Sequence, residues 1–337
     1  MKRILLLGTG GTIACKRTDK GLKPVITSDE ILSYVPDSQS YCEIHSIQLM
    51  NIDSTNIQPC HWLAVEKAIE ENYSQYDGFV ITHGTDTMAY TAAALSYLIQ
   101  HSPKPIIITG AQKTIDMENT DARTNLADSL LFASCPGAHG VNIVFDGKVI
   151  AGTRGKKEWT KSYHAFSSIN FPYVAIIQDG QIIFYLDDKD RDKEPVCFYR
   201  QMDGDVGLMK LIPSMDASLL DYMAEHYDAV IIESFGVGGL PSYQDGDYHG
   251  AIARWTGLGK TVIMTTQVTN EGSDMSVYEV GRSIKQEFGL LEAYDMTLEA
   301  VVTKIMWILG QTKDPARIRR MFYETVNRDI LWKWSEN

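Results

Sequence analysis

Residues 4–14 read ILLLGTGGTIA, four aliphatic side chains followed by glycine and threonine. An uninterrupted apolar run of this length is typical of a strand buried in a parallel sheet, and glycine lets the backbone turn sharply where the strand ends. Open α/β folds bind their ligands at that edge, beyond the carboxyl ends of the strands. The stretch therefore predicts a buried first strand that delivers the hydroxyl of Thr12 to a ligand site.

The glycine-rich turn matches neither of two common nucleotide-binding motifs. The fingerprint Gly-x-Gly-x-x-Gly requires a third glycine where this chain has Ile13, and no Gly-Lys-Ser/Thr follows to make a phosphate loop. Two interpretations of Thr12 stay open at this level. It is either a reactive hydroxyl or a turn residue that hydrogen-bonds the backbone.

A second stretch, VITHGTDTM at residues 80–88, repeats the arrangement of an apolar run, a glycine and a threonine. Here Asp86 directly follows Thr85, and the Ala- and Leu-rich segment that begins at Met88 is predicted to be helical. A carboxylate near a helix N-terminus is stabilised by unpaired N–H groups. Two hydroxyls at strand ends, one followed by a carboxylate, indicate nucleophilic chemistry by threonine. The alternative makes Asp86 a cap, Thr85 a turn residue and His83 a structural hydrogen-bonding group.

Strands and helices alternate along most of the chain, which favours an α/β fold with a mostly parallel sheet covered on both faces. We predict a larger N-terminal α/β domain at residues 1–186, a linker at 187–205 and a smaller C-terminal α/β domain at 206–337. The linker begins with DDKDRDKEP, which has no apolar residue and ends in proline. In the first domain the expected strands are 4–7, 78–82, 105–109 and 141–145, and the expected helices are 60–72, 88–100 and 121–133. In the second, the expected strands are 206–212, 229–233 and 262–266, and the expected helices are 218–225, 248–257, 298–309 and 315–323.

The composition is that of a folded globular protein, with 337 residues, 44% hydrophobic and 22% charged. The net charge of −12 disfavours binding to nucleic acid or to an anionic membrane, since both require clustered Lys and Arg. Five cysteines without a Cys-x-x-Cys pair indicate neither a disulfide framework nor a zinc site. The apolar run at residues 4–7 is too short for a secretion signal, and no stretch is long enough to span a bilayer. We therefore expect a cytoplasmic protein.

The two threonine motifs resemble the two signatures of the bacterial-type L-asparaginase family. The resemblance extends over nearly the whole chain, and the sequences of the motifs are most similar to those of the cytoplasmic type I branch. It includes residues 50–55 (MNIDST), 105–112 (PIIITGAQ), 152–157 (GTRGKK) and 234–238 (SFGVG). The resemblance implies a homodimer or homotetramer that hydrolyses L-asparagine to L-aspartate and ammonia, with no metal or organic cofactor. Its partner would be a small amino-acid substrate.

Catalytic roles follow from the resemblance position by position. Thr12 would attack the side-chain amide carbon and form an acyl-enzyme, while Thr85, Asp86 and Lys157 would move protons and position water. Which threonine attacks first stays open. A threonine hydroxyl needs a base, and lysine suits that role because its pKa shifts readily. Alignment of Gly152 and of residues 165–168 with the family assigns the catalytic lysine to Lys157 and not to its neighbour Lys156.

Substrate binding is implied for a second set of residues. Ser54 and Thr55 would hold the α-carboxylate, and Asp86 would also pair with the α-ammonium group. Backbone N–H groups near Thr85 and Ala111 would line the oxyanion site. The alternative interpretation of Ser54 and Thr55 is helix capping before Pro59. The full implied set is Gly11, Asp53, Ser54, Thr55, Gly84 and Ala111.

The chain departs from the family pattern in two places. The family uses a tyrosine in the loop after the first motif, where this chain has Leu22. Either another hydroxyl, such as that of Thr18, replaces it, or a shift over residues 18–23 rearranges the loop. The positions that bind activating asparagine in some type I enzymes are Lys156 and Val268 here, so no such regulation is expected. We also expect residues 233–239 to lie near the site.

Three functions therefore stay open. Besides the asparaginase, one is a glutaminase or an ammonia-supplying subunit of a tRNA amidotransferase. The other is a non-catalytic amino-acid sensor, which the loss of the tyrosine at Leu22 favours.

Overall fold

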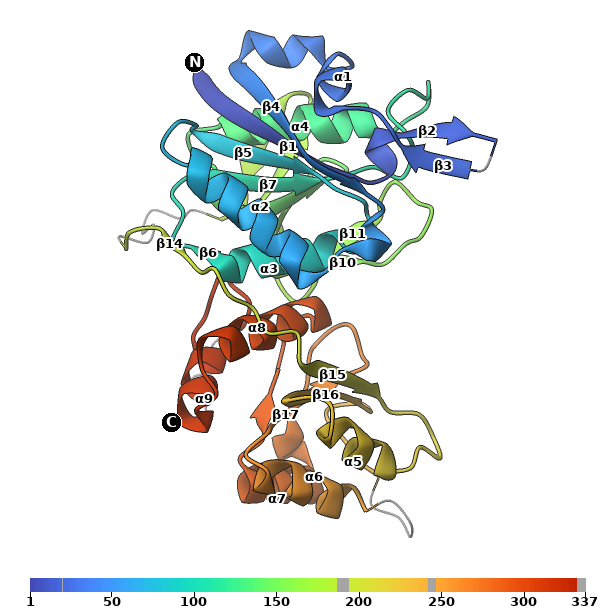
Figure 1. The fold of residues 1–337 in the computed structure, drawn as a ribbon, viewed down its shortest axis with the longest axis vertical. Helices are drawn as coiled ribbons and strands as arrows, with labels where there is room; N and C mark the ends of the chain where they lie inside the picture. The colour runs from blue at the N-terminus through green and yellow to red at the C-terminus, as the bar shows by residue number, and fades with distance from the viewer. Residues whose placement is uncertain (20, 187–193, 242–246, 332–337) are drawn as a thin grey trace. The chain divides into compact units, whose positions relative to one another are not determined.

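The structure is a computed structural model, and it describes residues 1–19, 21–186, 194–241 and 247–331. The chain divides into two compact units, Met1–Arg200 and Gln201–Asn337, which are described separately (Figure 1). Residues 187–193 of the predicted linker lie outside the described residues. In the described part of the chain, no helix is long and apolar enough to cross a membrane.

The N-terminal unit is built on an eight-stranded sheet with the order β13-β12-β9-β8-β7-β5-β1-β4. Strands β4, β1, β5, β7 and β8 run parallel, while β9, β12 and β13 join by antiparallel pairing. The sheet strands are β1 (Lys2–Gly10), β4 (Cys42–Ile52), β5 (Gly78–Thr82), β7 (Pro105–Thr109), β8 (Gly140–Phe145), β9 (Lys148–Ala151), β12 (Ala175–Gln178) and β13 (Gln181–Phe184). The mostly parallel sheet that the alternation predicted is confirmed.

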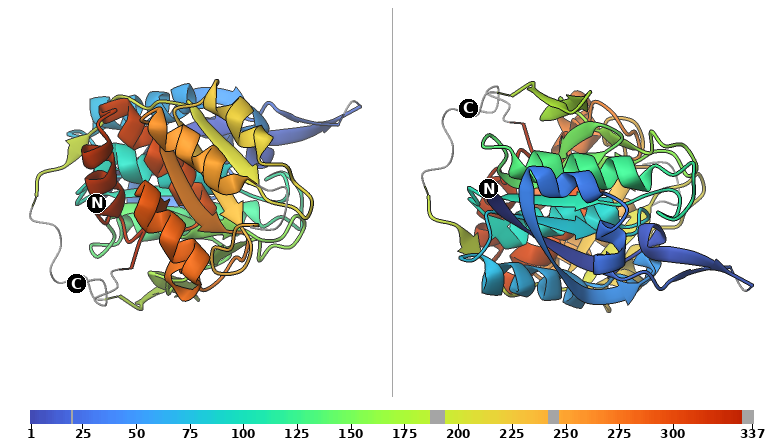
Figure 2. Two further views of the ribbon diagram at one scale, coloured as in Figure 1. Left: turned by 90° about the horizontal axis from the view of Figure 1, so that it is seen from below. Right: turned by 90° about the horizontal axis from the view of Figure 1, so that it is seen from above.

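Helices cover both faces of this sheet, with α1 and α4 on one side and α2 and α3 on the other (Figure 2). Leu126 and Leu130 of α4 share one apolar core with Ile4 and Leu6 of β1 and Val80 of β5. Because β5 and β7 are buried along their whole length, their sequences are apolar without alternation. The helices are α1 (Ser28–Leu32), α2 (Pro59–Asn72), α3 (Met88–Leu98) and α4 (Ala122–Ser134).

Small two-stranded sheets complete the unit: β2 (Cys15–Thr18) with β3 (Gly21–Pro24), β10 (Gly155–Lys157) with β11 (Phe166–Ser168), and β6 (Ile99–Gln100) with β14 (Cys197–Phe198). The last pair corrects one expectation, because the helix predicted over 88–100 ends at Leu98. The backbone of residues 99 and 100 pairs instead with residues 197 and 198, a contact that no local pattern reveals.

The C-terminal unit has an all-parallel sheet with the order β15-β16-β17-β18. Helices α5, α6 and α7 share one apolar core with this sheet, while α8 packs against β15 and α9. The elements are β15 (Val206–Lys210), α5 (Ser218–Ala224), β16 (Ala229–Ser234), α6 (Tyr248–Gly257), β17 (Thr261–Thr266), α7 (Glu279–Phe288), β18 (Leu291–Glu292), α8 (Leu298–Gln311) and α9 (Pro315–Tyr323). The smaller second α/β domain is thereby confirmed.

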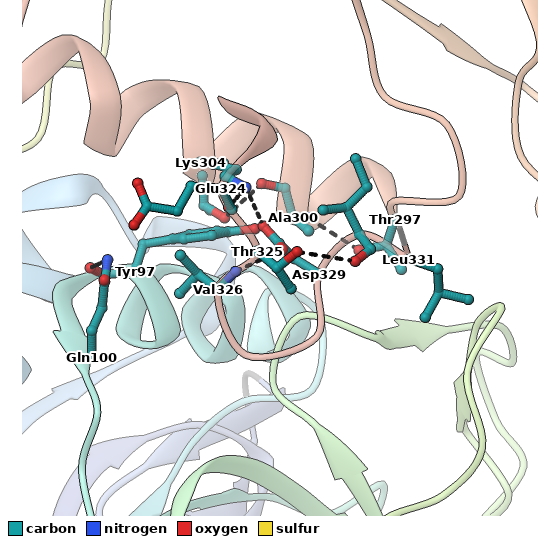
Figure 3. A network of polar contacts seen from close by, with 12 residues as sticks. Tyr97, Gln100, Thr297, Ala300, Lys304, Glu324, Thr325, Val326, Asp329 and Leu331 are labelled. Carbon is teal, nitrogen blue, oxygen red and sulfur yellow. Dashed lines mark hydrogen bonds and ion pairs between the residues drawn. The ribbon is translucent and has the colours of Figure 1, made fainter. Parts of the chain in front are cut away.

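A buried ion pair ties α8 to the turn that follows α9 (Figure 3). The Lys304 ammonium donates to Oδ2 of Asp329 at 2.6 Å and to the carbonyl of Glu324 at 2.7 Å. The other carboxylate oxygen, Oδ1, accepts the backbone N–H of Val326 at 2.9 Å. Both charged side chains are fully buried. Burial lowers the pKa of Lys304, and the carboxylate of Asp329 opposes that shift.

Asp329→Ala is expected to destabilise the C-terminal unit by about 3–5 kcal/mol, since it removes the carboxylate that faces the buried ammonium of Lys304 at 2.6 Å. The free energy of unfolding in urea measures this loss. The matched control is Asp221→Ala in the same unit, which breaks an ion pair with Arg254 whose two side chains are 42% and 51% exposed. That control should cost at most about 1 kcal/mol. Equal losses in the two variants would contradict a structural role for the buried pair.

Candidate active site

The two threonine motifs meet at the carboxyl edge of the N-terminal sheet. Strands β1 and β5 are parallel neighbours, and Gly8 pairs with Thr82 at their carboxyl ends. The loops that follow then touch, since a Cβ on Gly11 would collide with the backbone nitrogen of Gly84. Gly11 also has φ of 77°, a left-handed conformation that favours glycine. Thr12 and Thr85 each follow one of these two touching glycines.

Lys157 reaches this edge from β10. Its Nζ lies 2.8 Å from Oγ1 of Thr85 and 2.6 Å from Oδ1 of Asp86, and it donates a hydrogen bond to each. The lysine side chain is 17% exposed and that of Asp86 is 58% exposed, so the lysine is mostly enclosed while its carboxylate partner faces solvent. Successive strand residues point to opposite faces, which is why Lys157 and not Lys156 makes this contact.

The residues expected to bind substrate form the wall beside the threonines. Ser54 is buried against Gly84, where a Cβ would lie 2.5 Å from its hydroxyl oxygen. Asp53 caps the 3-10 turn Ser54–Asn56, because its Oδ1 accepts both the N–H and the hydroxyl of Thr55 at 2.9 Å. The helix α2 that begins at Pro59 has Gln58 as its N-cap, so neither Ser54 nor Thr55 caps it.

Ala111 lies at the same edge, two residues beyond the end of β7, which pairs with β5 through Thr82 and Thr109. Its side chain is fully buried. Gly11, Thr12, Ser54, Gly84 and Thr85 thus lie together at one sheet edge, with Ala111 following the adjacent strand. Lys157 and Asp86 are joined to this group through Thr85. The roles of these residues in binding or catalysis stay predictions.

Family models match both units of the chain. The model described as "Asparaginase, N-terminal" covers residues 3–190, and the one described as "Glutaminase/Asparaginase C-terminal domain" covers residues 205–322. The chain belongs to the asparaginase family. The resemblance drawn from the two threonine motifs is thereby confirmed.

Two named relatives match most of this chain. An L-asparaginase of Thermococcus kodakarensis is 37% identical over 97% of this chain and 99% of its own length. A glutamyl-tRNA(Gln) amidotransferase subunit of Pyrococcus furiosus is 34% identical over 94% of this chain and 74% of its own length.

Solved asparaginase structures share the fold over nearly the whole chain. The thermostable L-asparaginase of Thermococcus kodakarensis superposes with a TM-score of 0.93 at 35% identity, covering 98% of this chain and all of that one. L-asparaginase I of Vibrio cholerae superposes with a TM-score of 0.85 at 26% identity, covering 98% of this chain and 99% of that one.

Gln112 is a site residue to which the sequence analysis gave no role. The hydroxyl of Thr85 donates to its Oε1 at 3.4 Å, while its Nε2 donates to the carbonyls of Trp159 and Ser162 at 3.3 and 3.0 Å. Gln112 thereby links Thr85 to the loop that follows Lys157. The position of Gln112 directly after Ala111 in the motif PIIITGAQ could have marked it as a site residue. Its contacts could not be predicted, because the two loop carbonyls lie about fifty positions further along the chain.

The loop in which the asparaginase family has its tyrosine forms the hairpin β2–β3. In its backbone register Leu22 pairs with Arg17 and Gly21 with Thr18. The hairpin extends away from the body of its unit (Figure 2). The side chains of Leu22 and Thr18 lie outside the described part of the structure. That the hydroxyl of another residue takes over the role of the tyrosine therefore stays a prediction.

One acidic cluster in the described residues has the spacing of a metal site, formed by Asp203, Asp205 and Asp228 in the C-terminal unit. The ammonium of Lys313 already donates to Asp203 at 2.7 Å and to Asp228 at 2.8 Å. This internal cation neutralises part of the negative charge that would attract a metal ion. The cluster therefore gives no support for a metal cofactor.

Residues 233–239 span the end of β16 and the turn that follows it, at the carboxyl edge of the C-terminal sheet. Ser234 is buried and its hydroxyl donates to the carbonyl of Thr265 at 2.7 Å, and Phe235 and Gly239 close a short turn. Their position relative to the threonines stays a prediction.

Proposed function

We propose that this chain hydrolyses L-asparagine to L-aspartate and ammonia through a threonine-bound acyl-enzyme. One observation supports it above all: Lys157 donates to both Thr85 and Asp86, at 2.8 and 2.6 Å. Lys157 thereby joins the hydroxyl of Thr85 to the carboxylate of Asp86, and such a hydroxyl–lysine–carboxylate set can relay protons, which is what a weak threonine nucleophile requires.

The reaction then has two halves. In the first, Oγ1 of Thr12 attacks the carboxamide carbon, the C–N bond breaks, and the hydroxyl proton leaves with the nitrogen as ammonia. In the second, water adds to the ester, the C–O bond to Thr12 breaks, and the water proton returns to the hydroxyl. Thr85, Asp86 and Lys157 shuttle the protons and hold the water. Within the described residues no hydrogen bond engages the Thr12 hydroxyl, so it is available to substrate.

The charges of the site suit the α-ammonium and α-carboxylate groups of the substrate. The exposed carboxylate of Asp86 suits an α-ammonium group, and the hydroxyl of Ser54 suits an α-carboxylate. The decisive measurement is ammonia release from both enantiomers of asparagine and of glutamine. Rapid release from L-asparagine supports the proposal, and no release from any of the four contradicts it.

A second candidate function rests on the relatives named as subunits of a glutamyl-tRNA(Gln) amidotransferase. Such a chain would supply ammonia to a partner protein instead of releasing it. The net charge of −12 disfavours direct contact with tRNA. Fast turnover of L-asparagine by the isolated chain favours the asparaginase, whereas turnover that depends on added amidotransferase subunits and glutamyl-tRNA favours this alternative.

The asparaginase is also proposed to work in the cytoplasm as a homodimer or homotetramer. All five cysteines are free, which suits a reducing compartment. Sedimentation equilibrium of the purified protein tests the oligomeric state.

Leu22→Tyr is expected to raise asparagine turnover by about one to two powers of ten, since a positioned proton donor typically contributes ~10²–10⁴. Steady-state kcat for the two proteins measures the gain. An unchanged rate in a folded variant would mean that another group already fills the role, and Thr18→Val then identifies it by a loss of activity. If neither the wild type nor Leu22→Tyr releases ammonia, the sensor interpretation replaces the enzyme, and calorimetric binding of asparagine tests it.

A further inference from the structure

A chain of buried hydrogen bonds ends on the peptide group that precedes Thr85. Nε1 of Trp62 in α2 lies 2.9 Å from Oγ1 of Thr91 in α3, which lies 2.9 Å from Nε2 of His83. Nδ1 of His83 in turn lies 2.7 Å from the carbonyl oxygen of Gly84. The three side chains are 6%, 1% and 1% exposed, so solvent does not compete for these contacts.

The direction of every bond in this chain is fixed by its two ends. An indole N–H only donates and a carbonyl only accepts. The imidazole proton is therefore on Nδ1, where it is donated to Gly84, and in a neutral ring Nε2 can then only accept. The hydroxyl of Thr91 donates to Nε2 and accepts from Trp62. Burial lowers the pKa of His83 to about 4, and the carbonyl of Gly84 opposes that shift, so the ring is neutral at pH 7.

Anchoring the Gly84 carbonyl also sets the direction of the next N–H. A trans peptide is planar, so its C=O and N–H point in opposite directions, and the described residues contain no cis peptide. With the carbonyl held toward His83 in the interior, the N–H of Thr85 points away from it. Within the described part of the chain this N–H has no hydrogen-bond acceptor. It belongs to the residue whose hydroxyl contacts Lys157.

We infer that His83, held by Thr91 and Trp62, is a positioning residue that aims the backbone N–H of Thr85 at the carboxamide oxygen of the substrate. That oxygen gains negative charge when the amide carbon is attacked, and a preoriented N–H stabilises it most when it does not have to reorganise. A hydrogen bond on the carbonyl also polarises the N–H of the same peptide. This inference rests on the proposed amidohydrolase function and adds to it a residue without direct contact to the reacting atoms.

The test compares three replacements with a matched control. His83→Leu removes the anchor, and we expect kcat for L-asparagine to fall by about tenfold or more, less than the ~10²–10³ of losing a donor outright. KM and the Kd of L-aspartate should stay unchanged, because the charge develops only in the transition state. His83→Asn places an amide N–H near the position of Nδ1 and should restore most of kcat. Thr91→Val should give a smaller loss.

The control is Ser96→Ala, which removes another buried α3 hydroxyl, one that donates to the carbonyl of Ala92. Thermal melting checks that all variants fold. If His83→Leu lowers kcat no more than the control does, raises KM instead, or is not rescued by a folded His83→Asn, the positioning role is wrong.

Nitrogen NMR of the imidazole adds a readout that does not need activity. We expect a neutral His83 with its proton on Nδ1 at pH 7, and a proton on Nε2 or a charged ring would overturn the inference. An inactive wild type would remove the proposed function and this role with it. If the ring of such an inactive protein is nevertheless protonated on Nδ1, the proposed activity is wrong and the assignment of the hydrogen bonds is right.

Discussion

Thr12→Ala and Thr85→Val are each expected to reduce asparagine turnover by a factor on the order of 10⁴ or more, because a lost nucleophile or proton relay removes the covalent route. Both residues follow touching glycine turns at the ends of β1 and β5. Thr85→Val also deprives the Lys157 ammonium of a hydrogen-bond acceptor at 2.8 Å. Ammonia release under saturating substrate measures both losses.

Two controls separate chemistry from folding in these variants. Unchanged thermal melting and retained calorimetric binding of L-aspartate would show that the site is intact. Thr55→Val gives a comparison within the implied binding set, since its hydroxyl donates to Asp53 in an exposed turn, and any loss there should appear mainly in KM. Near-normal turnover in Thr12→Ala or in Thr85→Val would remove that residue from the mechanism.

Lys157→Met is expected to lower kcat by about 10²–10⁴, the range of a positioned acid–base group. Methionine keeps the length of the side chain but leaves Thr85 and Asp86 without their shared donor. The matched control is the neighbouring Lys156→Met, which removes the same charge from the opposite face of β10 and should leave kcat near the wild-type value. Steady-state kinetics of the two variants test the assignment. If Lys156→Met is the inactive variant, the lysine role belongs one residue earlier.

Much of the fold was determined by local patterns. The apolar runs at residues 4–7 and 105–109 predict buried parallel strands because no alternation is needed when both faces are covered. The helix at residues 248–257 has the predicted bounds. Lys157 was assigned from a resemblance along the chain, and the alternation of β10 turns that residue toward Thr85.

Strand β4 shows where local patterns fail. Residues 42–52 form the edge strand beside β1, yet the sequence analysis predicted no strand there. An edge strand is covered by fewer neighbours, so its sequence CEIHSIQLMNI lacks the continuous apolar run that identified β5. Only its pairing with β1 makes it part of the sheet.

The sequence by itself determined the α/β class, the two glycine turns and the hydroxyls that follow them, because each depends on residues adjacent in the chain. Only the tertiary structure decided which partners those groups meet. Gln112 contacts loop carbonyls about fifty positions away, Lys304 of α8 meets Asp329 beyond α9, and Trp62 of α2 is linked to His83 through Thr91. Each of these contacts joins elements brought together by burial of apolar surface, which is non-directional and leaves no local pattern for the polar pair.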